Sequence, residues 1–423
     1  MHSSLERVSL EQDICAPRDF KGDYLSFKRA SGSVLISEDD TEFYDLINGK
    51  GSVLLGHNPP ELKEKLISFI QGDRDVRTGF HESINVVSKH LCDLCKSESV
   101  AFFKTGSSAA VAASRALQNL EDKKIVLSSG YHGYDPYWHA DHKNPNNHGI
   151  IDFFYDLDLL RENIRKFKNQ IAGIVLSPDY IYLPKKWYEE FFNLIDENNI
   201  KLISDEIKQG LRINPPISIE RYGYKPYASL LSKGLANGHP ISAVIGPKSL
   251  LMHLKYHTYT AFFDPLGFCA TEFVLGRLKD GSAQAYIKSN TIMICNYLNK
   301  SLKDNYLNAK VAFSETFFQF IFEDLKVEAE FYKNCLCEGI LLYEFDNQTI
   351  SAAYSGKDIR NLLKKFDQAI KATANASLIT AQDEVSSWAI YQAAWRLIDG
   401  LPWIEGDSFN KRRLILNRLQ DEL

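Results

Sequence analysis

The sequence predicts an α/β fold in which helices cover both faces of a mostly parallel β-sheet. Short, almost continuously apolar segments occur at residues 171–178, 201–206, 227–232 and 241–246, and the amphipathic segment 185–199 lies between the first two. A strand that is buried on both faces is apolar throughout, and helices make the crossover connections between parallel strands. Ligands of such sheets bind beyond the carboxyl ends of the strands, so functional residues are expected there.

Residues 100–120 contain the same pattern of strand, turn and helix. The apolar stretch VAFFK leads into the turn Thr105-Gly106-Ser107-Ser108, which is followed by the alanine-rich stretch AAVAASRALQNL. A helix N-terminus offers unpaired N–H groups and the positive end of a dipole, and Gly106 lets a ligand approach the backbone. The turn is therefore a candidate phosphate site, although such turns also simply join a strand to a helix. It is not a Walker loop, because GxxxxGK[ST] is absent.

The chain before residue 100 is expected to form short strands and two helices. Residues 24–57 contain two β-rich runs with a turn at residues 38–40, followed by a glycine-rich passage, which predicts a small β-meander and a loop. Helices are expected at residues 59–70, where two prolines begin the segment, and near residues 83–96.

Length and composition favour a two-domain protein that binds small molecules. With 423 residues, the chain exceeds what one hydrophobic core usually holds. Its net charge of -5 gives no basic field for nucleic acid or for an anionic membrane. No signal peptide is recognisable at the amino terminus, and nowhere do about 18 apolar residues follow one another. We therefore expect a cytoplasmic protein without nucleic-acid or membrane partners.

Two short motifs raise the question of a metal site. Cys92 and Cys95 form a CxxC, but they lie in a segment whose apolar residues recur at helical spacing, which favours packing on a helix face. His139 and His142 form an HxxH in the loop-like segment 136–150, where no carboxylate or cysteine cluster accompanies them. Seven cysteines, an odd number, do not suggest a disulfide framework. The expectation is that the protein has no metal site.

An acid and a lysine follow two successive predicted strands. The segment 201–206 ends in the acidic pair Asp205 and Glu206, and Lys233 comes directly after the segment 227–232. A carboxylate at a strand end can keep a ring nitrogen protonated, and a lysine can form a Schiff base with a carbonyl; pyridoxal phosphate (PLP) needs both groups. Taken alone, Asp205 is better explained as a helix cap and Lys233 as a surface charge, so further evidence from the chain is needed. Tyr131, between glycines at another strand end, is placed to stack on a flat ring or simply to line a loop.

The ordered motifs of the chain resemble the class III aminotransferases of PLP fold type I, and most of all their glutamate-1-semialdehyde aminomutase branch. The resemblance runs from about residue 24 to about residue 372 and is carried by GSVLLGHNPP, KTGSSAAVAASRAL, GYHGY, KLISDEIKQGLR, LLSKGLANGHPISAVIG, TYTAFFDPLGFCAT and the closing passage CEGILLYEFDNQTISAAYSGKDIRNLLKKF. It implies a large domain with a mostly parallel sheet of the seven-stranded type, and a smaller α+β domain formed by both chain ends.

The resemblance also assigns roles to residues around the cofactor. Lys233 would be the Schiff-base lysine and proton carrier, and Asp205 would pair with the pyridinium nitrogen of PLP. Ile207 would lie beneath the ring, while Tyr131 would stack on its other face with His132 beside it.

Further residues would hold the phosphate and the substrate. Gly106 and Ser107 would bind the phosphate, and Thr260 would reach the phosphate of a neighbouring subunit, which implies a homodimer with shared sites. Lys50 and Arg29 are candidates for contact with the substrate. The resemblance does not identify the amino donor or the carbonyl acceptor.

The expected domains follow from the same resemblance. Residues 1–57 would be the N-terminal part of the small domain, residues 58–270 the large PLP-binding domain and residues 271–375 the C-terminal part of the small domain. Residues 376–423 extend beyond the family's usual end, and we expect a helical extension whose apolar face docks on the body or on a partner.

Three functions are compatible with these observations. The first is an aminotransferase that works in two ping-pong half-reactions, and the second is an intramolecular aminomutase of the glutamate-1-semialdehyde type. The third is an inactive scaffold, suggested because Ser108 and Ser177 stand where the family usually has glutamates and because the tail is added. Lys50 also replaces a tryptophan that is frequent in the aminomutase branch, and Asp264 replaces a usual asparagine.

Overall fold

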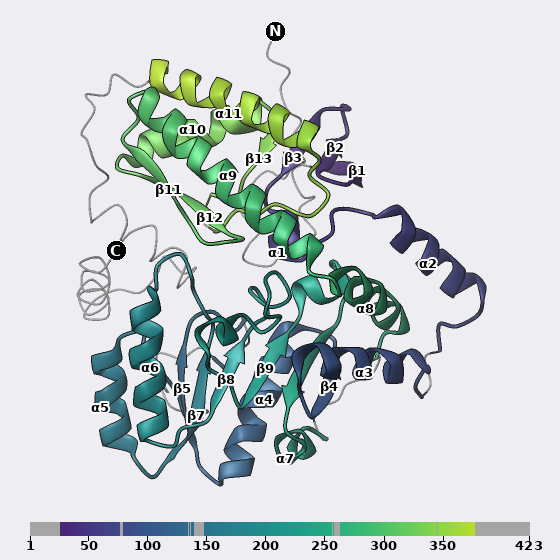
Figure 1. Ribbon diagram of the computed structural model, residues 1–423, viewed down its shortest axis with the longest axis vertical. Helices are drawn as coiled ribbons and strands as arrows, with labels where there is room; N and C mark the ends of the chain where they lie inside the picture. Colours follow the sequence, from purple (N-terminus) through teal and green to yellow (C-terminus); the bar gives the residue numbers. More distant parts are fainter. Residues whose placement is uncertain are drawn as a thin grey trace, which may run out of the picture.

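A computed structural model describes residues 26–76, 79–133, 135, 137–138, 148–255, 257, 263–344 and 346–376. Figure 1 shows a large domain below and a smaller domain above, with the chain passing between them more than once. The predicted α/β fold is confirmed, and so is the small domain formed by both chain ends.

The large domain is built on a seven-stranded sheet. Its order is β4 (Ser99–Phe103), β10 (Ser242–Gly246), β9 (Ala228–Leu231), β8 (Leu202–Asp205), β7 (Ile171–Leu176), β5 (Ile125–Ser129) and β6 (Ile150–Asp152). Strand β10 is antiparallel to both of its neighbours, and the remaining pairs are parallel. Since β4 and β9 both run opposite to β10, they run in the same direction as each other. The carboxyl ends of β4, β9, β8, β7 and β5 therefore lie on one edge.

Apolar side chains cover both faces of this sheet. Successive residues of a strand belong to different buried clusters, as with Leu127 and Val126 on β5 and with Leu202 and Ile203 on β8. The cluster that includes Val126 and Ile203 is completed by the alanines of α4 (Gly106–Glu121), whose small side chains let the helix lie close to the strands. This double burial explains why the strands are apolar throughout.

Strand β6 lies partly where the sequence suggested a loop over residues 136–150. The expectation is wrong at its end, because Ile150 pairs with Val126 at the edge of the sheet. A three-residue strand shows no recognisable periodicity in the sequence. Its position depends on Gly149, where a Cβ atom would lie only 2.2 Å from the backbone oxygen of Lys124.

The remaining helices of the large domain surround the sheet. They are α2 (Pro60–Gln71), α3 (Ser83–Cys95), α5 (Leu157–Phe167), α6 (Lys185–Glu197), α7 (Lys248–Leu251) and α8 (Pro265–Leu278), together with the short 3-10 helices η1 (Ser218–Tyr222), η2 (Lys233–Ala236) and η3 (Met252–Leu254). Cys95 on α3 is buried in the core and Cys92 is half-buried, which confirms packing on a helix face. Burial raises the pKa of the Cys95 thiol to about 12.

The small domain joins residues from both ends of the chain. Its sheet has the order β1 (Phe27–Ser31), β2 (Val34–Ser37), β3 (Glu42–Asp45) and β13 (Ile340–Leu341), and the short helix α1 (Asn48–Gly51) follows β3. The hairpin β11 (Ala309–Phe313) and β12 (Phe318–Phe322) and the helices α9 (Ser282–Asp304), α10 (Leu325–Cys337) and α11 (Gly356–Ala376) complete it. The domain boundaries at 57/58 and 270/271 stay predictions, and the extension after residue 376 lies outside the described residues.

Among the described residues, no helix is long and apolar enough to cross a membrane. In the same part of the chain, no group of three or more histidine, cysteine, aspartate or glutamate side chains is arranged to hold a metal ion. His139 and His142 lie outside it.

Candidate active site

The predicted site residues follow strands whose carboxyl ends share one edge of the large sheet. Gly106 and Ser107 come after β4, Tyr131 and His132 after β5, Asp205 ends β8, and Lys233 follows β9. Segments separated by as much as about a third of the chain thus meet at this edge, as expected for an α/β sheet.

The turn before α4 is fixed by its own side chains. Thr105 is the N-cap, and its Oγ1 accepts a hydrogen bond from the Ser108 backbone N at 3.1 Å. In turn, the Thr105 backbone N donates a hydrogen bond to the Ser108 hydroxyl at 3.3 Å, which completes a capping box. Because this box engages the third helical residue, the first two amides, those of Gly106 and Ser107, are left at the helix end, where they can donate to an anion.

Glycines bring the separate turns into close contact. A Cβ atom on Gly106 would lie 2.9 Å from Cδ1 of Ile207, so the phosphate turn and the residue after Asp205 touch each other. A Cβ atom on Gly133, whose φ is +103°, would lie 2.1 Å from the Ser107 hydroxyl. The turn after β4 therefore packs between the turns after β5 and β8, and only glycine leaves room for this arrangement.

Asp205 is a buried carboxylate with two hydrogen-bond donors. Its Oδ2 lies 2.7 Å from His132 Nδ1, and its Oδ1 accepts a hydrogen bond from the Ile207 backbone N at 3.1 Å. Asp205 is 1% exposed and His132 is 3% exposed. The ring of His132 also lies against Trp138, with 4.6 Å between the ring centroids. These contacts fix the orientation of the Asp205 carboxylate.

The neighbouring acid, Glu206, has a structural role. It is fully buried, and its Oε1 accepts hydrogen bonds from the Ser204 hydroxyl at 2.8 Å and from the Ile219 backbone N at 3.1 Å. Burial raises the pKa of its carboxyl group despite these contacts. Of these two acids, it is Asp205 whose side chain contacts His132 and the Ile207 backbone N.

Lys233 begins η2 in a left-handed backbone conformation, with φ of 38°. Burial is the main cause that lowers its pKa to about 8 from the ordinary 10.5, and the positive charges of Lys208 and Arg212 act in the same direction. Asp346 and Asp205 act against this shift. A lysine with this pKa holds a substantial neutral fraction near pH 7 to 8, as a nucleophile or general base requires.

Lys208, Asp346 and Phe317 were not among the residues that the sequence singled out. Lys208 lies three positions after Asp205 in the same motif, and only this closeness in sequence could have suggested that Lys208 belongs to the site. Asp346 and Phe317 come from the small domain and approach the site only through the tertiary fold.

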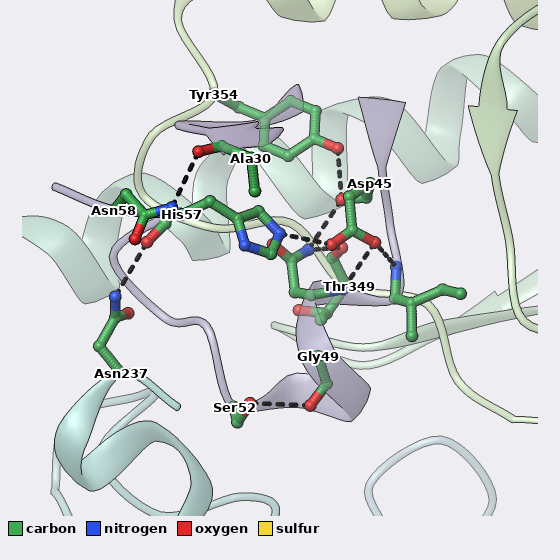
Figure 2. A network of polar contacts seen from close by, with 12 residues as sticks. Ala30, Asp45, Gly49, Ser52, His57, Asn58, Asn237, Thr349 and Tyr354 are labelled. Atoms are coloured by element: carbon green, nitrogen blue, oxygen red, sulfur yellow. Dashed lines mark hydrogen bonds and ion pairs between the residues drawn. The ribbon is translucent and has the colours of Figure 1, made fainter. Parts of the chain in front are cut away.

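A polar network fixes the loop that carries Lys50, as Figure 2 shows. Asp45, at the end of β3, pairs with His57 Nε2 through its Oδ2 at 2.7 Å and accepts a hydrogen bond from the Asn48 backbone N at 2.9 Å through its Oδ1. The Asn48 side chain donates to the Thr349 carbonyl at 2.7 Å, and the Tyr354 hydroxyl donates to the Asp45 carbonyl at 2.6 Å. The network thus ties the loop to the carboxyl-terminal half of the small domain.

The turn at residues 48–51 projects Lys50 from a left-handed backbone. All four residues have positive φ values, between 48° and 81°. Lys50 Nζ lies 5.4 Å from the centre of the Tyr343 ring, and the Gly51 carbonyl accepts a hydrogen bond from the Arg212 guanidinium. The turn therefore contacts residues of both domains.

The Asn237 side chain joins the same loop to the turn of Lys233. Its Oδ1 accepts a hydrogen bond from the Leu55 backbone N at 2.7 Å, and its Nδ2 donates to the Gly56 carbonyl at 2.9 Å. Asn237 is the C-cap of η2, so the glycine-rich loop is attached directly to the end of the helix that begins with Lys233.

The other predicted residues have different surroundings. Tyr131 is 43% exposed at the edge of the sheet. Arg29 lies on β1 with a largely exposed side chain, 3.6 Å from Asp40. Thr260 lies outside the described residues.

The fold and this arrangement of residues define a PLP-type α/β enzyme, and comparisons with known proteins give its family. The family model "Aminotransferase class-III" matches residues 139–370, which is more than half of the chain, so the chain belongs to this family of PLP-dependent enzymes.

Two curated relatives illustrate the range of the family. The chain is 31% identical to a 2'-deamino-2'-hydroxyneamine transaminase of Streptomyces kanamyceticus over 250 residues, which are 57% of this chain and 64% of that enzyme. It is 26% identical to a glutamate-1-semialdehyde 2,1-aminomutase of Methanococcus maripaludis (strain C6) over 395 residues, which are 85% of this chain and 91% of that enzyme.

Solved structures share the fold. The FumI protein of Sphingopyxis sp. MTA144, in its PLP internal aldimine form, superposes with a TM-score of 0.77 at 21% identity and covers 84% of this chain and 90% of that one. A transaminase with PLP bound gives a TM-score of 0.75 at 17% identity, with coverage of 83% of this chain and 92% of that one. The expected fold type is thereby confirmed.

The residues present at the sheet edge fit PLP, the cofactor of this family. Gly106 and Ser107 offer amides for a phosphate, beside a glycine cradle that a Cβ atom would fill. The buried carboxylate of Asp205 suits a protonated ring nitrogen, and Lys233 has the lowered pKa that an amine bound to a carbonyl requires.

Proposed function

We propose that this protein is an aminotransferase that moves an amino group from an amino donor to an aldehyde or ketone acceptor in two half-reactions. The observation that carries this proposal is the position of Lys233, with its lowered pKa, at the same sheet edge as the buried pair of Asp205 and His132. Membership of the class III family supports the reaction type and an active enzyme over an inactive scaffold.

When bound, PLP supplies a carbonyl carbon that takes up the amino group and a ring that accepts electrons from the substrate carbon. In its neutral form, Lys233 accepts a proton at Nζ from the donor carbon and delivers it within the same pocket. Because burial lowers its pKa, Lys233 has a larger neutral fraction near neutral pH than an exposed lysine has. The acceptor half-reaction uses the same proton transfer in the opposite direction.

With PLP bound, the Asp205 carboxylate would be the partner of the protonated ring nitrogen. The hydrogen bond from the Ile207 backbone N and the contact with His132 Nδ1 orient the two carboxylate oxygens. His132 is thus a positioning residue for Asp205. Gly106 and Ser107 would hold the phosphate through their backbone amides.

The site residues on the other side of the cofactor belong to the same proposal. Tyr131 would stack on the ring, with Ile207 on the opposite face. Lys50 and Arg29 remain candidates for substrate contact, and the projection of Lys50 next to Tyr343 favours Lys50 of the two.

A homodimer with shared sites is also part of this proposal. Large apolar side chains on and between α2 and α3 are exposed, among them Ile70 at 54% and Phe80 at 66%, and such a surface favours a partner subunit. Thr260 of a second copy would complete the phosphate site. The cytoplasm is the proposed location.

An intramolecular aminomutase is the second candidate. It is favoured by the extent of the match to aminomutase relatives, which reaches 91% of their length, compared with 64% for the transaminase. The two candidates differ in whether the amino group passes between two separate molecules.

An isotope experiment distinguishes them. The purified enzyme with PLP is incubated with ¹⁵N-labelled amino acids and unlabelled aldehyde or ketone acceptors, and separately with ¹⁵N-labelled amino aldehydes that carry both groups on one molecule. The label is followed by mass spectrometry. Transfer of ¹⁵N to the separate acceptor supports the aminotransferase. Retention of ¹⁵N in a rearranged product of the labelled molecule supports the aminomutase and excludes the first proposal.

The Lys233→Ala variant tests the site itself. We expect it to lose turnover and to retain PLP only non-covalently, so that borohydride reduction links no cofactor to the protein. Lys89→Ala, a change in an exposed helical ion pair, is the matched control. Full activity of Lys233→Ala would show that the pocket has been assigned wrongly.

A further inference from the structure

An ion pair between the two domains lies at the sheet edge that carries Lys233. Asp205 pairs with Leu230 on the neighbouring parallel strands β8 and β9, and Lys208 and Lys233 each follow this pair by three residues. Lys208 Nζ of the large domain contacts Asp346 Oδ1 of the small domain at 2.8 Å. Lys208 follows β8 three residues after Asp205, whereas Asp346 lies between β13 and α11. Both side chains are mostly shielded from solvent, with exposures of 24% and 31%. The pair therefore exists only while the two domains are in contact.

The surroundings hold Lys208 in this position. Its Nζ lies 5.2 Å from the centre of the Phe317 ring, and the Arg212 guanidinium lies 4.8 Å from the same ring. Arg212 Nε also donates to the Lys208 carbonyl at 3.1 Å, and Arg212 is 1% exposed. The aromatic ring of the small domain thus contacts two cations of the large domain.

Four charged groups act on Lys233. After burial, the largest influence on its pKa is the positive charge of Lys208, which lowers it, followed by the negative charge of Asp346, which raises it. Arg212 lowers the pKa and Asp205 raises it, both less strongly. In turn, Lys208 and Lys233 outweigh the effect of burial on Asp346 and lower the pKa of its carboxyl group. Lys208 and Asp346 therefore shift the pKa of Lys233 in opposite directions and follow one another directly in strength.

We propose that Lys208 and Asp346 are a pair of positioning residues that together set the protonation of Lys233, with the small domain supplying the acidic member. This inference deepens the proposed function, on which it rests, because the proton carrier has to be neutral when it receives a proton. The positive charge of Lys208 favours the neutral form of Lys233, and the negative charge of Asp346 favours the protonated form. Together the two charges partly cancel.

Opposite shifts in two single variants are the signature of this arrangement. Lys208→Met removes a positive charge and leaves Asp346 unbalanced, so Lys233 should hold its proton to higher pH. Asp346→Asn leaves Lys208 unbalanced, so Lys233 should lose its proton at lower pH. Each shift is expected to be about 0.5–1 pH unit, since the pair is partly exposed to solvent. The double variant should return toward the wild-type value.

The measurement uses the full chain freed of PLP by dialysis. Only a neutral amine undergoes reductive methylation, so the rate at Lys233 is followed against pH by mass spectrometry of the peptide that contains it. Lys89→Met, in the exposed pair with Asp93, is the control that should leave the midpoint unchanged. Circular dichroism verifies folding, and Lys208→Gln replaces Lys208→Met if the latter does not fold. The shifts should shrink in high salt.

The outcomes are clear-cut. Midpoints that move in opposite directions support the proposal, whereas unchanged midpoints or shifts of the same sign overturn it, because loosening of the domain contact alone would act in one direction. Borohydride trapping of PLP on Lys233 in the wild-type protein is measured separately. If trapping fails while the opposite shifts appear, the proposed function is wrong and the electrostatic pair remains.

Discussion

The contact between Gly106 and Ile207 makes a sharp test of the cofactor site. In a Gly106→Ala variant, the new Cβ atom would lie 2.9 Å from Ile207 Cδ1, 3.2 Å from Cγ2 and 3.3 Å from Cγ1. Carbon atoms in favourable contact are about 3.5–4.0 Å apart, so the turn and the isoleucine have to separate by several tenths of an ångström. Because these residues are the proposed supports of the phosphate and the ring, this movement should weaken PLP binding.

The expected loss follows from the cost of overpacking. Inserting a methyl group into a well-packed region typically costs about 1–3 kcal/mol. Without PLP, the end of α4 can move away and relieve the contact, whereas bound PLP requires the turn in its original place. The cost should therefore appear as a decrease in PLP affinity of about 5- to 150-fold.

A second substitution identifies the responsible atom. Ile207→Val removes Cδ1, the nearest atom, so the double variant Gly106→Ala with Ile207→Val should regain part of the affinity. Gly276→Ala on α8 is the control, because a Cβ atom there meets nothing within 4 Å. Affinity is measured by PLP titration of dialysed protein, followed by absorbance. Unchanged affinity of Gly106→Ala, or no recovery in the double variant, would refute the proposed placement of the phosphate turn.

Three further predictions concern buried ionisable groups. Asp205→Asn should lower turnover by several orders of magnitude while circular dichroism remains that of the wild type, and an unaffected rate would exclude its role at the ring nitrogen. Asp45→Ala should lower the free energy of unfolding by about 3 kcal/mol in urea titrations, because the contact with His57 and the backbone hydrogen bonds are lost. The control Asp40→Ala, at an exposed site, should change the free energy of unfolding by less than about 0.5 kcal/mol. In PLP-free protein, folded Lys233 has a pKa of about 8 and the unfolded chain the ordinary 10.5, so the unfolded state binds more protons between these values. The free energy of unfolding should therefore rise with pH across this window in the wild type relative to Lys233→Met, and the absence of such a rise in urea titrations at several pH values would contradict the lowered pKa.

The sequence predicted those features that follow from the local pattern of apolar residues and from the order of the strands along the chain. Apolar runs predicted the central strands to within about two residues, because strands buried on both faces need continuous apolar sequence. The same reasoning brought five residues to one edge, since parallel strands end on the same side; they are Gly106, Ser107, Tyr131, Asp205 and Lys233. The β6 strand was missed because three residues at a sheet edge carry no periodic signal.

Local pattern did not separate the roles of neighbouring acids. Asp205 and Glu206 are adjacent and both are buried, yet Glu206 accepts hydrogen bonds from Ser204 and Ile219 while Asp205 contacts His132. Alternation along a strand sends consecutive side chains in different directions. Which direction leads to the site depends on the packed neighbours.

The sequence by itself determined the fold class, the edge of the sheet that carries the site, and the family to which the motifs belong. Only the tertiary structure placed Asp346 and Phe317 of the small domain beside Lys208, and joined the turn of Lys50 to Arg212. The physical reason is that parallel strands align their ends through local hydrogen-bonding rules, whereas contacts between domains depend on how two separately formed surfaces fit. The proton affinity of Lys233 is consequently a property of the assembled domains.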